Sequence, residues 1–173
     1  MPMSGYMQQL RGKVGHDLLL LPSAAVVIHD ERMRLLLCLH HDKNSWVTPG
    51  GLIEPGEQPA DAAVRETWEE TGLLVELTGI LGVYGGPELI IDYPNGDRTA
   101  YVGTIFRGRI AGGSVRPDGE EILDVRYFTR EELARIRHAR WMDTAMPVLF
   151  SQNGEPHFVG ASWRPEGNSG SDV

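Results

Sequence analysis

The sequence has little of several features that would narrow its function at once. Cys38 is the only cysteine, so no intramolecular disulfide can form and nothing indicates an oxidising compartment. Its 16 Lys and Arg residues are outnumbered by 24 Asp and Glu, which gives a formal net charge of −8. Nucleic acids and anionic membranes attract a basic surface, so neither is expected as a partner. A small phosphate ligand remains compatible, because one divalent metal ion reverses the sign of a pocket.

No apolar run near the N-terminus is long enough to cross a bilayer. The stretch "LLLLPSAAVVIHD" is broken by Pro22 and ends at His29-Asp30, far short of the roughly 20 residues that a membrane helix needs. It also lacks the pattern of a signal peptide, and no repeat of fixed period is evident. We therefore expect a cytoplasmic protein whose 173 residues form a single domain with its own core.

Short apolar runs separated by turn signals predict several strands. Residues 1–17 are expected to form a lead-in strand or arm, residues 18–150 the domain, and residues 151–173 an extension whose end, "RPEGNSGSDV", is disordered. The turn "PNGD" predicts a hairpin. Strands are predicted at Leu18–Leu21, Ala24–His29, Arg34–Leu39, Trp46–Thr48, Ile80–Tyr84, Glu88–Tyr93, Arg98–Arg109 and Val125–Phe128.

Three segments carry helix signals. Pro59 suits a first helical position and Gly72 a C-cap, which predicts a helix over Pro59–Thr71. A capping box at residues 129–132 predicts a second helix through roughly Ile136 or beyond, and a third helical piece is expected over residues 141–150, interrupted at Pro147. Strands and helices in mixed order place the chain in the α/β or α+β class, although the order of the strands is not predictable.

The first helix carries three carboxylates on one side. At 100° per residue, Glu66, Glu69 and Glu70 fall within one 100° arc. Ala62 and Ala63 flank this arc with small side chains that leave space above it. The residues expected to face the core lie on the opposite side: Ala60, Val64, Thr67, Trp68 and Thr71.

This clustering costs free energy in an isolated helix. Glu66 and Glu70 form an i,i+4 pair without a lysine partner, which costs a few tenths of a kcal/mol. Glu69 and Glu70 also lie in the last turn, where the helix dipole disfavours negative charge. A solvated acidic face is one explanation. A site for Mg²⁺ or Mn²⁺ is the other, because these ions require oxygen ligands held close together.

The spacing of the surrounding residues carries a family resemblance. The stretch "GLIEPGEQPADAAVRETWEETGL" reads Gly51, five residues, Glu57, seven residues, Arg65-Glu66-Thr67, one residue, Glu69-Glu70, one residue, Gly72-Leu73. It resembles the signature box of the Nudix hydrolases at every charged and glycine position. Thr67 departs from the pattern, which usually has an aliphatic residue there. "WVTPGG" and "DGEEILDVRYF" also look like flanking family segments, so the resemblance covers roughly residues 23 to 133.

The resemblance implies a fold and a reaction. The Nudix fold is a mixed β-sheet packed between helices, an α/β/α sandwich. The family's reaction is attack of water on a phosphorus of a diphosphate, usually in a nucleoside diphosphate derivative. It implies Mg²⁺ or Mn²⁺ as cofactor and a small nucleotide as partner, and it leaves a homodimer open.

The resemblance also implies roles for individual residues. Glu66, Glu69 and Glu70 match the metal ligands, together with the backbone carbonyl of Gly50. The general base varies within the family, and the candidates are Glu66, Glu69 and Glu121, with Glu120 as the neighbour that could be confused with Glu121. Glu57 and Arg65 match a pair that supports the site by tying the loop to the helix.

Substrate contacts are less clearly indicated. Trp46, Tyr84, Tyr93 and Tyr101 are candidates for stacking on a nucleoside, with core packing favoured for Trp46. His40 and His41 follow a buried strand, and a surface position at the strand end is favoured over a phosphate contact. Pro87 lies near the position where some family branches that cleave ADP-ribose have a proline, but "GGPELIIDYPNGD" does not otherwise resemble that branch. Oxidised nucleoside triphosphates, dinucleoside polyphosphates and sugar nucleotides stay open.

Two other functions share the fold. A non-catalytic nucleotide sensor would usually add a DNA-binding segment and have an eroded box, whereas this box is complete. An enzyme resembling isopentenyl diphosphate isomerase would need a catalytic cysteine, and Cys38 lies in the strand-like run "RLLLCLH", where plain core packing is favoured.

Overall fold

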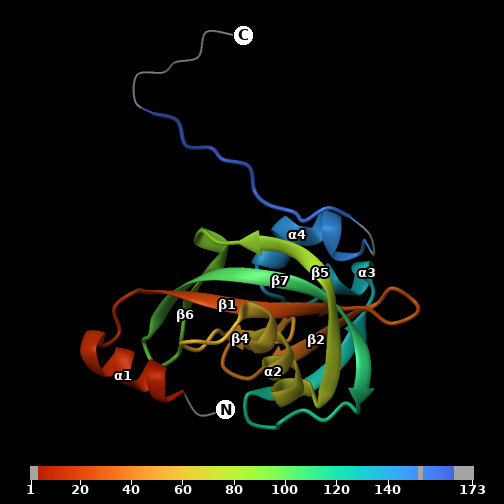
Figure 1. Ribbon diagram of the computed structural model, residues 1–173, viewed down its shortest axis with the longest axis horizontal. Helices are drawn as coiled ribbons and strands as arrows, with labels where there is room; N and C mark the ends of the chain where they lie inside the picture. The colour runs from red at the N-terminus through yellow and green to blue at the C-terminus, as the bar shows by residue number, and fades with distance from the viewer. Residues whose placement is uncertain (1–3, 152–153, 166–173) are drawn as a thin grey trace.

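Two β-sheets lie side by side in the computed structural model, which describes residues 4–151 and 154–165 (Figure 1). The larger sheet has the order β4-β1-β7-β5, with β6 beside β7. Its strands are β1 (Leu19–Ile28), β4 (Gly50–Leu52), β5 (Leu73–Tyr84), β6 (Ile90–Asp92) and β7 (Arg98–Gly113). The smaller sheet has the order β3-β2-β8, formed by β2 (Leu35–His40), β3 (Ser45–Val47) and β8 (Ile122–Phe128). Because β1 and β7 pair in parallel and the other pairs are antiparallel, the larger sheet is mixed.

Helices cover both sides of the sheets. The helices are α1 (Gly5–Val14), α2 (Pro59–Thr71), α3 (Arg130–Leu133) and α4 (Trp141–Leu149), with a 3₁₀ helix η1 at Pro87–Leu89. Successive side chains of a strand point to opposite faces, and β1 shows the result. Val26 packs with Ala62 of α2, whereas Val27 packs with Trp141 of α4. The predicted α/β/α arrangement of an α+β protein is therefore confirmed.

Several predicted elements change their bounds. Helix α2 begins and ends as predicted, but β1 runs unbroken through Pro22. Proline fits there because its carbonyl still accepts from the Ile53 N–H at 3.3 Å, and only its missing donor is lost. Strand β5 begins at Leu73, well before the predicted start, and Glu88 belongs to η1 rather than to a strand. Helix α3 ends at Leu133, short of the predicted Ile136. Helix α4 continues through Pro147 without the expected interruption.

Residues 5–14 form helix α1, where the sequence predicted a lead-in strand or arm. The Ser4 side chain accepts a hydrogen bond from the Met7 N–H at 3.2 Å, which is an ordinary N-cap contact. Met7 is the single buried residue of the helix, so the apolar periodicity that announces a helix is weak. The predicted disordered end lies, from residue 166 onward, outside the described residues. No helix in the described part of the chain is long and apolar enough to span a bilayer.

Candidate active site

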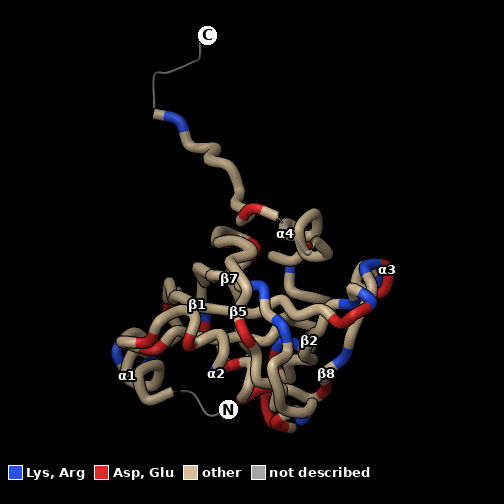
Figure 2. Tube along the Cα trace, turned by 45° about the vertical axis from the view of Figure 1, so that its right-hand side comes forward, with Lys and Arg blue, Asp and Glu red and all other residues tan. Residues whose placement is uncertain are grey.

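Helix α2 buries part of its acidic side against the protein. Ala62 and Ala63, predicted to leave space above the acidic arc, are fully buried. Of the residues predicted to face the core, Thr67 and Thr71 are fully buried, whereas Ala60 is exposed and Trp68 is 46% exposed. Small alanines let the helix approach the sheet closely, whereas the large indole remains at the edge. Glu70 is only 3% exposed. A solvated acidic face therefore does not explain the cluster, whose place along the chain is visible in Figure 2.

Glu70 is held by the backbone at the start of β4. Its Oε2 accepts from the Gly50 N–H at 2.9 Å. Burial nevertheless raises the pKa of Glu70 well above its usual range, because the single hydrogen bond only partly offsets lost hydration and the charges of Glu66 and Glu121 add repulsion. A buried carboxylate of this kind is stabilised in its ionised form by a cation.

The two glycines of β4 leave room for the helix and the neighbouring strand. A Cβ at Gly51 would lie 2.6 Å from the carboxyl carbon of Glu66. A Cβ at Gly50, where φ is 150°, would lie 2.4 Å from the carbonyl oxygen of Ala24. The Glu66 carboxylate lies so close to the backbone at position 51 that a side chain there would clash with it. This explains why the first residue of the box, Gly51, is a glycine.

Arg65 connects the box helix to the preceding loop. Its guanidinium donates to both oxygens of Glu57, at 2.8 and 2.9 Å, and to the Leu52 carbonyl at 3.1 Å. Nη1 also donates to Glu66 at 2.8 Å and to Glu69 at 3.0 Å. The hydrogen bond from Arg65 lowers the pKa of Glu57. For Glu66, burial raises the pKa and Arg65 opposes the change. One cation thus fixes three carboxylates.

Glu121 approaches these carboxylates from a different segment. Asp118 Oδ1 accepts from three successive backbone N–H groups, including that of Glu121 at 3.0 Å, and the Glu121 carbonyl accepts from the His41 N–H at 2.8 Å. Its Oε1 lies 3.1 Å from His40 Nε2, and this hydrogen bond holds the pKa of Glu121 below its usual range. Glu121 in turn contributes to the raised pKa of both Glu66 and Glu70.

His40 and Lys43 are the residues that sequence reasoning missed. His40 is 4% exposed, so the favoured surface position at the strand end is wrong. Lys43 is half-buried in the turn after β2; burial lowers the pKa of its ammonium, and the charges of Glu70 and Glu121 oppose that change. The pairing of β2 with β8 brings His40 to Glu121, and the sequence carries no signal for that pairing.

The four aromatic candidates occupy different places. The Tyr93 and Tyr101 hydroxyls are 2.7 Å apart, and burial raises the pKa of both phenols, with a contribution from the charge of Glu121. Tyr84 is 2% exposed and its ring lies beside Trp141 and His157. Trp46 is half-buried, edge-on to Phe128 at 4.6 Å. The charge of Glu121 thus influences the Tyr93 and Tyr101 phenols, whereas Tyr84 is enclosed in the core.

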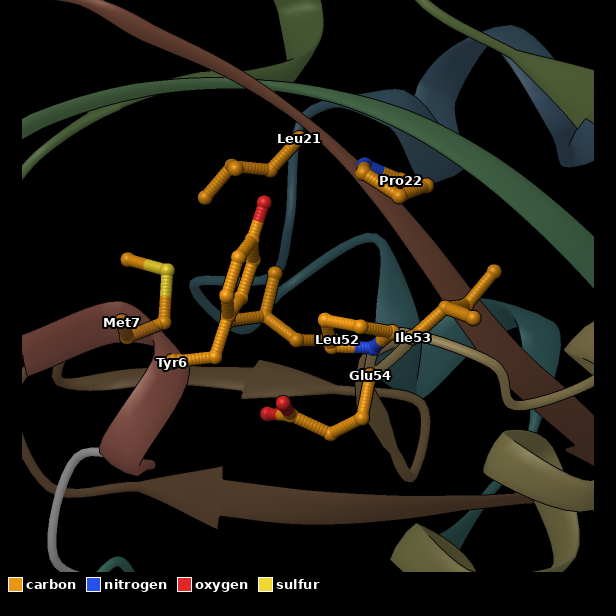
Figure 3. Close-up of a pocket in the computed structure, with 8 residues that line it drawn as sticks. Tyr6, Met7, Leu21, Pro22, Leu52, Ile53 and Glu54 are labelled. Carbon is orange, nitrogen blue, oxygen red and sulfur yellow. The ribbon is translucent and has the colours of Figure 1, made fainter. Parts of the chain in front are cut away.

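A cleft of about 210 Å³ separates α1 from the loop that leads into the box helix (Figure 3). Tyr6 and Met7 form one wall, Leu21 and Pro22 come from β1, and Leu52–Pro55 complete the lining. Two of the lining residues make hydrogen bonds to the Arg65–Glu57 pair. The Leu52 carbonyl accepts from Arg65, and the Glu54 N–H donates to Glu57 at 3.1 Å. Helix α1 therefore covers the loop that the Arg65–Glu57 pair holds.

The donor set around α2 has the chemistry of a hard-cation site. The carboxylates of Glu66, Glu69 and Glu70 offer oxygen ligands, which Mg²⁺ and Mn²⁺ prefer. Within residues 4–151 and 154–165, no three acidic, histidine or cysteine side chains have already converged on one point. Each carboxylate instead makes a hydrogen bond through one of its two oxygens, to Arg65 or to the Gly50 N–H. The residues fit such an ion by donor type and by their excess of negative charge.

Comparison with known proteins decides the family. A family model described as the NUDIX domain matches residues 19–149. The chain belongs to the Nudix family. A Streptomyces ambofaciens relative named as a MutT-like protein is 30% identical to this Nudix hydrolase over 163 residues, 90% of this chain and 97% of its own. A Bacillus subtilis relative, provisionally named an 8-oxo-dGTP diphosphatase, is 34% identical over 106 residues, and this match covers 61% of the present chain and 64% of that one.

Solved structures agree with the fold of this Nudix hydrolase. The crystal structure of a NUDIX hydrolase from Nitrosomonas europaea superposes with a TM-score of 0.64 at 25% identity, covering 83% of this chain and 78% of that one.

Cys38, which an isomerase-like mechanism would need as a reactive group, is fully buried, and burial raises the pKa of its thiol well above the usual range. A buried neutral thiol is inert.

Proposed function

We propose that this Nudix hydrolase cleaves the diphosphate linkage of a nucleoside diphosphate derivative by attack of water on phosphorus. The observation that carries the proposal is the arrangement of Glu66, Glu69 and Glu70 around one face of α2, with Glu70 almost fully buried. Carboxylates at this density repel a diphosphate, so a divalent cation between protein and substrate accounts for both their position and their charge.

Glu66, Glu69 and Glu70, with the Gly50 carbonyl, would hold Mg²⁺ or Mn²⁺. When bound, such an ion neutralises the diphosphate and lowers the pKa of a coordinated water. The protein's own groups perform the remaining work. Arg65 fixes the orientation of Glu66 and Glu69 through its Nη1, Glu57 orients Arg65, and a carboxylate accepts the proton of the attacking water. Glu66, Glu69 and Glu121 are the candidates for that last role.

The nucleoside is proposed to lie on the side of Tyr93 and Tyr101. Their rings are half-buried, and Glu121 influences the pKa of both phenols, which supports a position beside the carboxylates. An aromatic ring there offers a base a stacking surface. Trp46 and Tyr84 are weaker candidates because each already packs against other aromatic rings.

A substrate panel tests the proposal. The wild-type protein is incubated with Mg²⁺ or Mn²⁺ and with 8-oxo-dGTP, ADP-ribose, a dinucleoside polyphosphate and a UDP-sugar, and the phosphate products are separated by chromatography. At least one compound should be cleaved, and Glu66→Gln and Glu69→Gln should each lower kcat by roughly a hundredfold or more. Glu76→Gln serves as the control, because Glu76 is an exposed carboxylate on β5 that pairs with Arg109 of β7. Equal activity of all three variants would contradict the proposed site.

A further inference from the structure

We propose that His40 is a positioning residue that holds the Glu121 carboxylate in place to accept the proton of the attacking water. The inference rests on the proposed function, since it assigns one more part in that reaction. In the step concerned, a bond forms between the water oxygen and phosphorus, and the bond from phosphorus to the bridging oxygen breaks. The electron pair of that bond stays with the leaving phosphate, and the proton of the water moves to Glu121.

The first observation is the contact itself. His40 Nε2 lies 3.1 Å from Glu121 Oε1, and the side chain of His40 is only 5% exposed. An ionised carboxylate can only accept hydrogen bonds, so Nε2 carries the proton and donates. Asp118 and the His41 N–H fix the backbone of Glu121, but they leave the rotation of its side chain open. The contact with the imidazole constrains that rotation.

A β-bulge places His40 for this contact. Strands β2 and β8 keep a regular register as far as Leu39, which pairs with Asp124. The register then shifts by one residue, so that His40 pairs with Ile122 instead of Leu123. A bulge redirects a side chain, and bulges are frequent beside active sites. Here the shift brings His40 next to the residue that follows Glu121.

Packing alone does not explain a histidine at this position. The preceding residues of β2, Leu35–Cys38, are all fully buried and apolar or nearly so, and a leucine would continue the pattern. The imidazole instead leaves its Nδ1 buried without a hydrogen-bond partner among the residues described. Native structures rarely keep such an unsatisfied atom unless the side chain has another task. The contact with Glu121 is the task that the structure shows.

Glu121 is also better placed for the base than the other two candidates. Glu66 and Glu69 share one Arg65 nitrogen and match the expected metal ligands, so both carboxylates already have another task. Glu121 comes from another segment and receives its hydrogen bond from an imidazole. Its charge reaches Glu66 and Glu70, which places it in the same electrostatic environment without making it part of the Arg65 cluster.

The test compares three single variants on whichever panel substrate the wild type cleaves, with saturating Mg²⁺. We expect His40→Leu to lower kcat at least about tenfold with KM changed by less than about twofold. His40→Gln, which can present an N–H at similar reach, should recover a large part of the loss. His41→Gln is the matched control, because the His41 side chain is exposed and contacts Asp42. The rise of Tm with Mg²⁺ should persist in all three.

A double-variant cycle guards against misfolding of His40→Leu. If His40 acts through Glu121, then His40→Leu should add little to the loss already caused by Glu121→Gln, whereas a misfolded His40→Leu would add its full loss. Additive losses, or an unchanged kcat in a folded His40→Leu, would overturn the inference. Equal losses in His40→Leu and His40→Gln would assign His40 to packing and overturn it as well. A wild type that cleaves no compound would instead contradict the proposed function on which the inference depends.

Discussion

Arg65 binds both carboxylate oxygens of Glu57 at once, Nε to Oε1 at 2.8 Å and Nη2 to Oε2 at 2.9 Å. This planar, two-point contact uses the geometry that is special to a guanidinium. The nitrogens also reach Leu52, Glu66 and Glu69. Loop, helix and two proposed metal ligands therefore share one side chain, although Arg65 itself need not touch the substrate.

Replacing the guanidinium should affect catalysis more than folding. Arg65→Lys keeps the charge but can satisfy only part of this set, so Glu66 and Glu69 lose their fixed orientation. We expect kcat to fall roughly 10- to 100-fold, a smaller rise of Tm with Mg²⁺, and little change in the Tm of the metal-free protein. Steady-state kinetics and thermal melts measure both.

Glu57→Gln should reproduce these effects, because it breaks the same contact from the other side. The double variant should lose far less than the product of the two single losses, as expected for two residues that act as one unit. Independent, multiplicative losses would show that Arg65 and Glu57 have separate tasks.

The burial of Glu70 predicts a response to metal and to pH. Its folded-state pKa is raised, so the folded state binds a proton more tightly than the unfolded state. The metal-free protein should therefore lose stability as pH rises from the ordinary glutamate pKa through the raised one. At pH values above that window, Mg²⁺ or Mn²⁺ should raise Tm, because a ligand stabilises the state that binds it.

Glu70→Gln removes this titration. The metal-free variant should gain stability over the metal-free wild type, and this gain should be larger at pH 8 than at pH 4.5. Most of the Tm rise with Mg²⁺ should vanish in the variant. Urea unfolding at both pH values, with and without Mg²⁺, gives the comparison. A full metal response in Glu70→Gln would remove Glu70 from the ligands.

Gly51 predicts a loss of activity without a loss of fold. A methyl group there would meet the Glu66 carboxylate at 2.6 Å, so Gly51→Ala should displace that carboxylate and lower kcat by about tenfold or more, since small displacements of reacting groups are costly. Gly79→Ala is the matched control, because a Cβ at Gly79 meets nothing within 4 Å. Equal activity of the two variants would show that Glu66 can move without consequence.

Replacing Arg11 should affect the free energy of unfolding, although this residue lies away from the carboxylates of α2. Its side chain is 9% exposed and donates to the carbonyls of Gly15, Asp17 and Arg98 and to the Thr99 hydroxyl. Arg11→Met should lower the free energy of unfolding by about 3 kcal/mol, since Asp97 loses a buried partner. Lys13→Met, at an exposed position of the same helix, should change it by less than about 0.5 kcal/mol. Urea denaturation distinguishes the two outcomes.

Local signals and contacts between distant segments differ in how well the sequence reveals them. Pro59 and Gly72 set the ends of α2 through backbone chemistry that each residue carries alone, and the helix has those bounds. Which side of α2 is buried depends instead on the sheet. The sequence therefore placed Thr67 and Thr71 in the core correctly but placed Trp68 there wrongly.

The same distinction holds at the site. The box residues lie within 23 positions of one another, and their spacing alone pointed to Glu57, Arg65 and the three helix carboxylates. His40 reaches Glu121 only because β2 pairs with β8 through a shifted register, and no local pattern encodes that shift. Helix α1 escaped prediction because Met7 alone is buried along it.

The parallel pairing of β1 with β7 has a consequence for synthesis on the ribosome. Leu19 pairs with Thr99 and Ile28 with Gly108, so one edge of β1 can pair only after β7 has been synthesised. Pairing across such a long stretch of chain slows folding, and exposed strand edges favour aggregation of nascent chains. β4 can cover only the other edge, from Ser23 to Ala25. In a growing chain we therefore expect one edge of β1 to stay unpaired until the strand ending at Gly113 has left the exit tunnel.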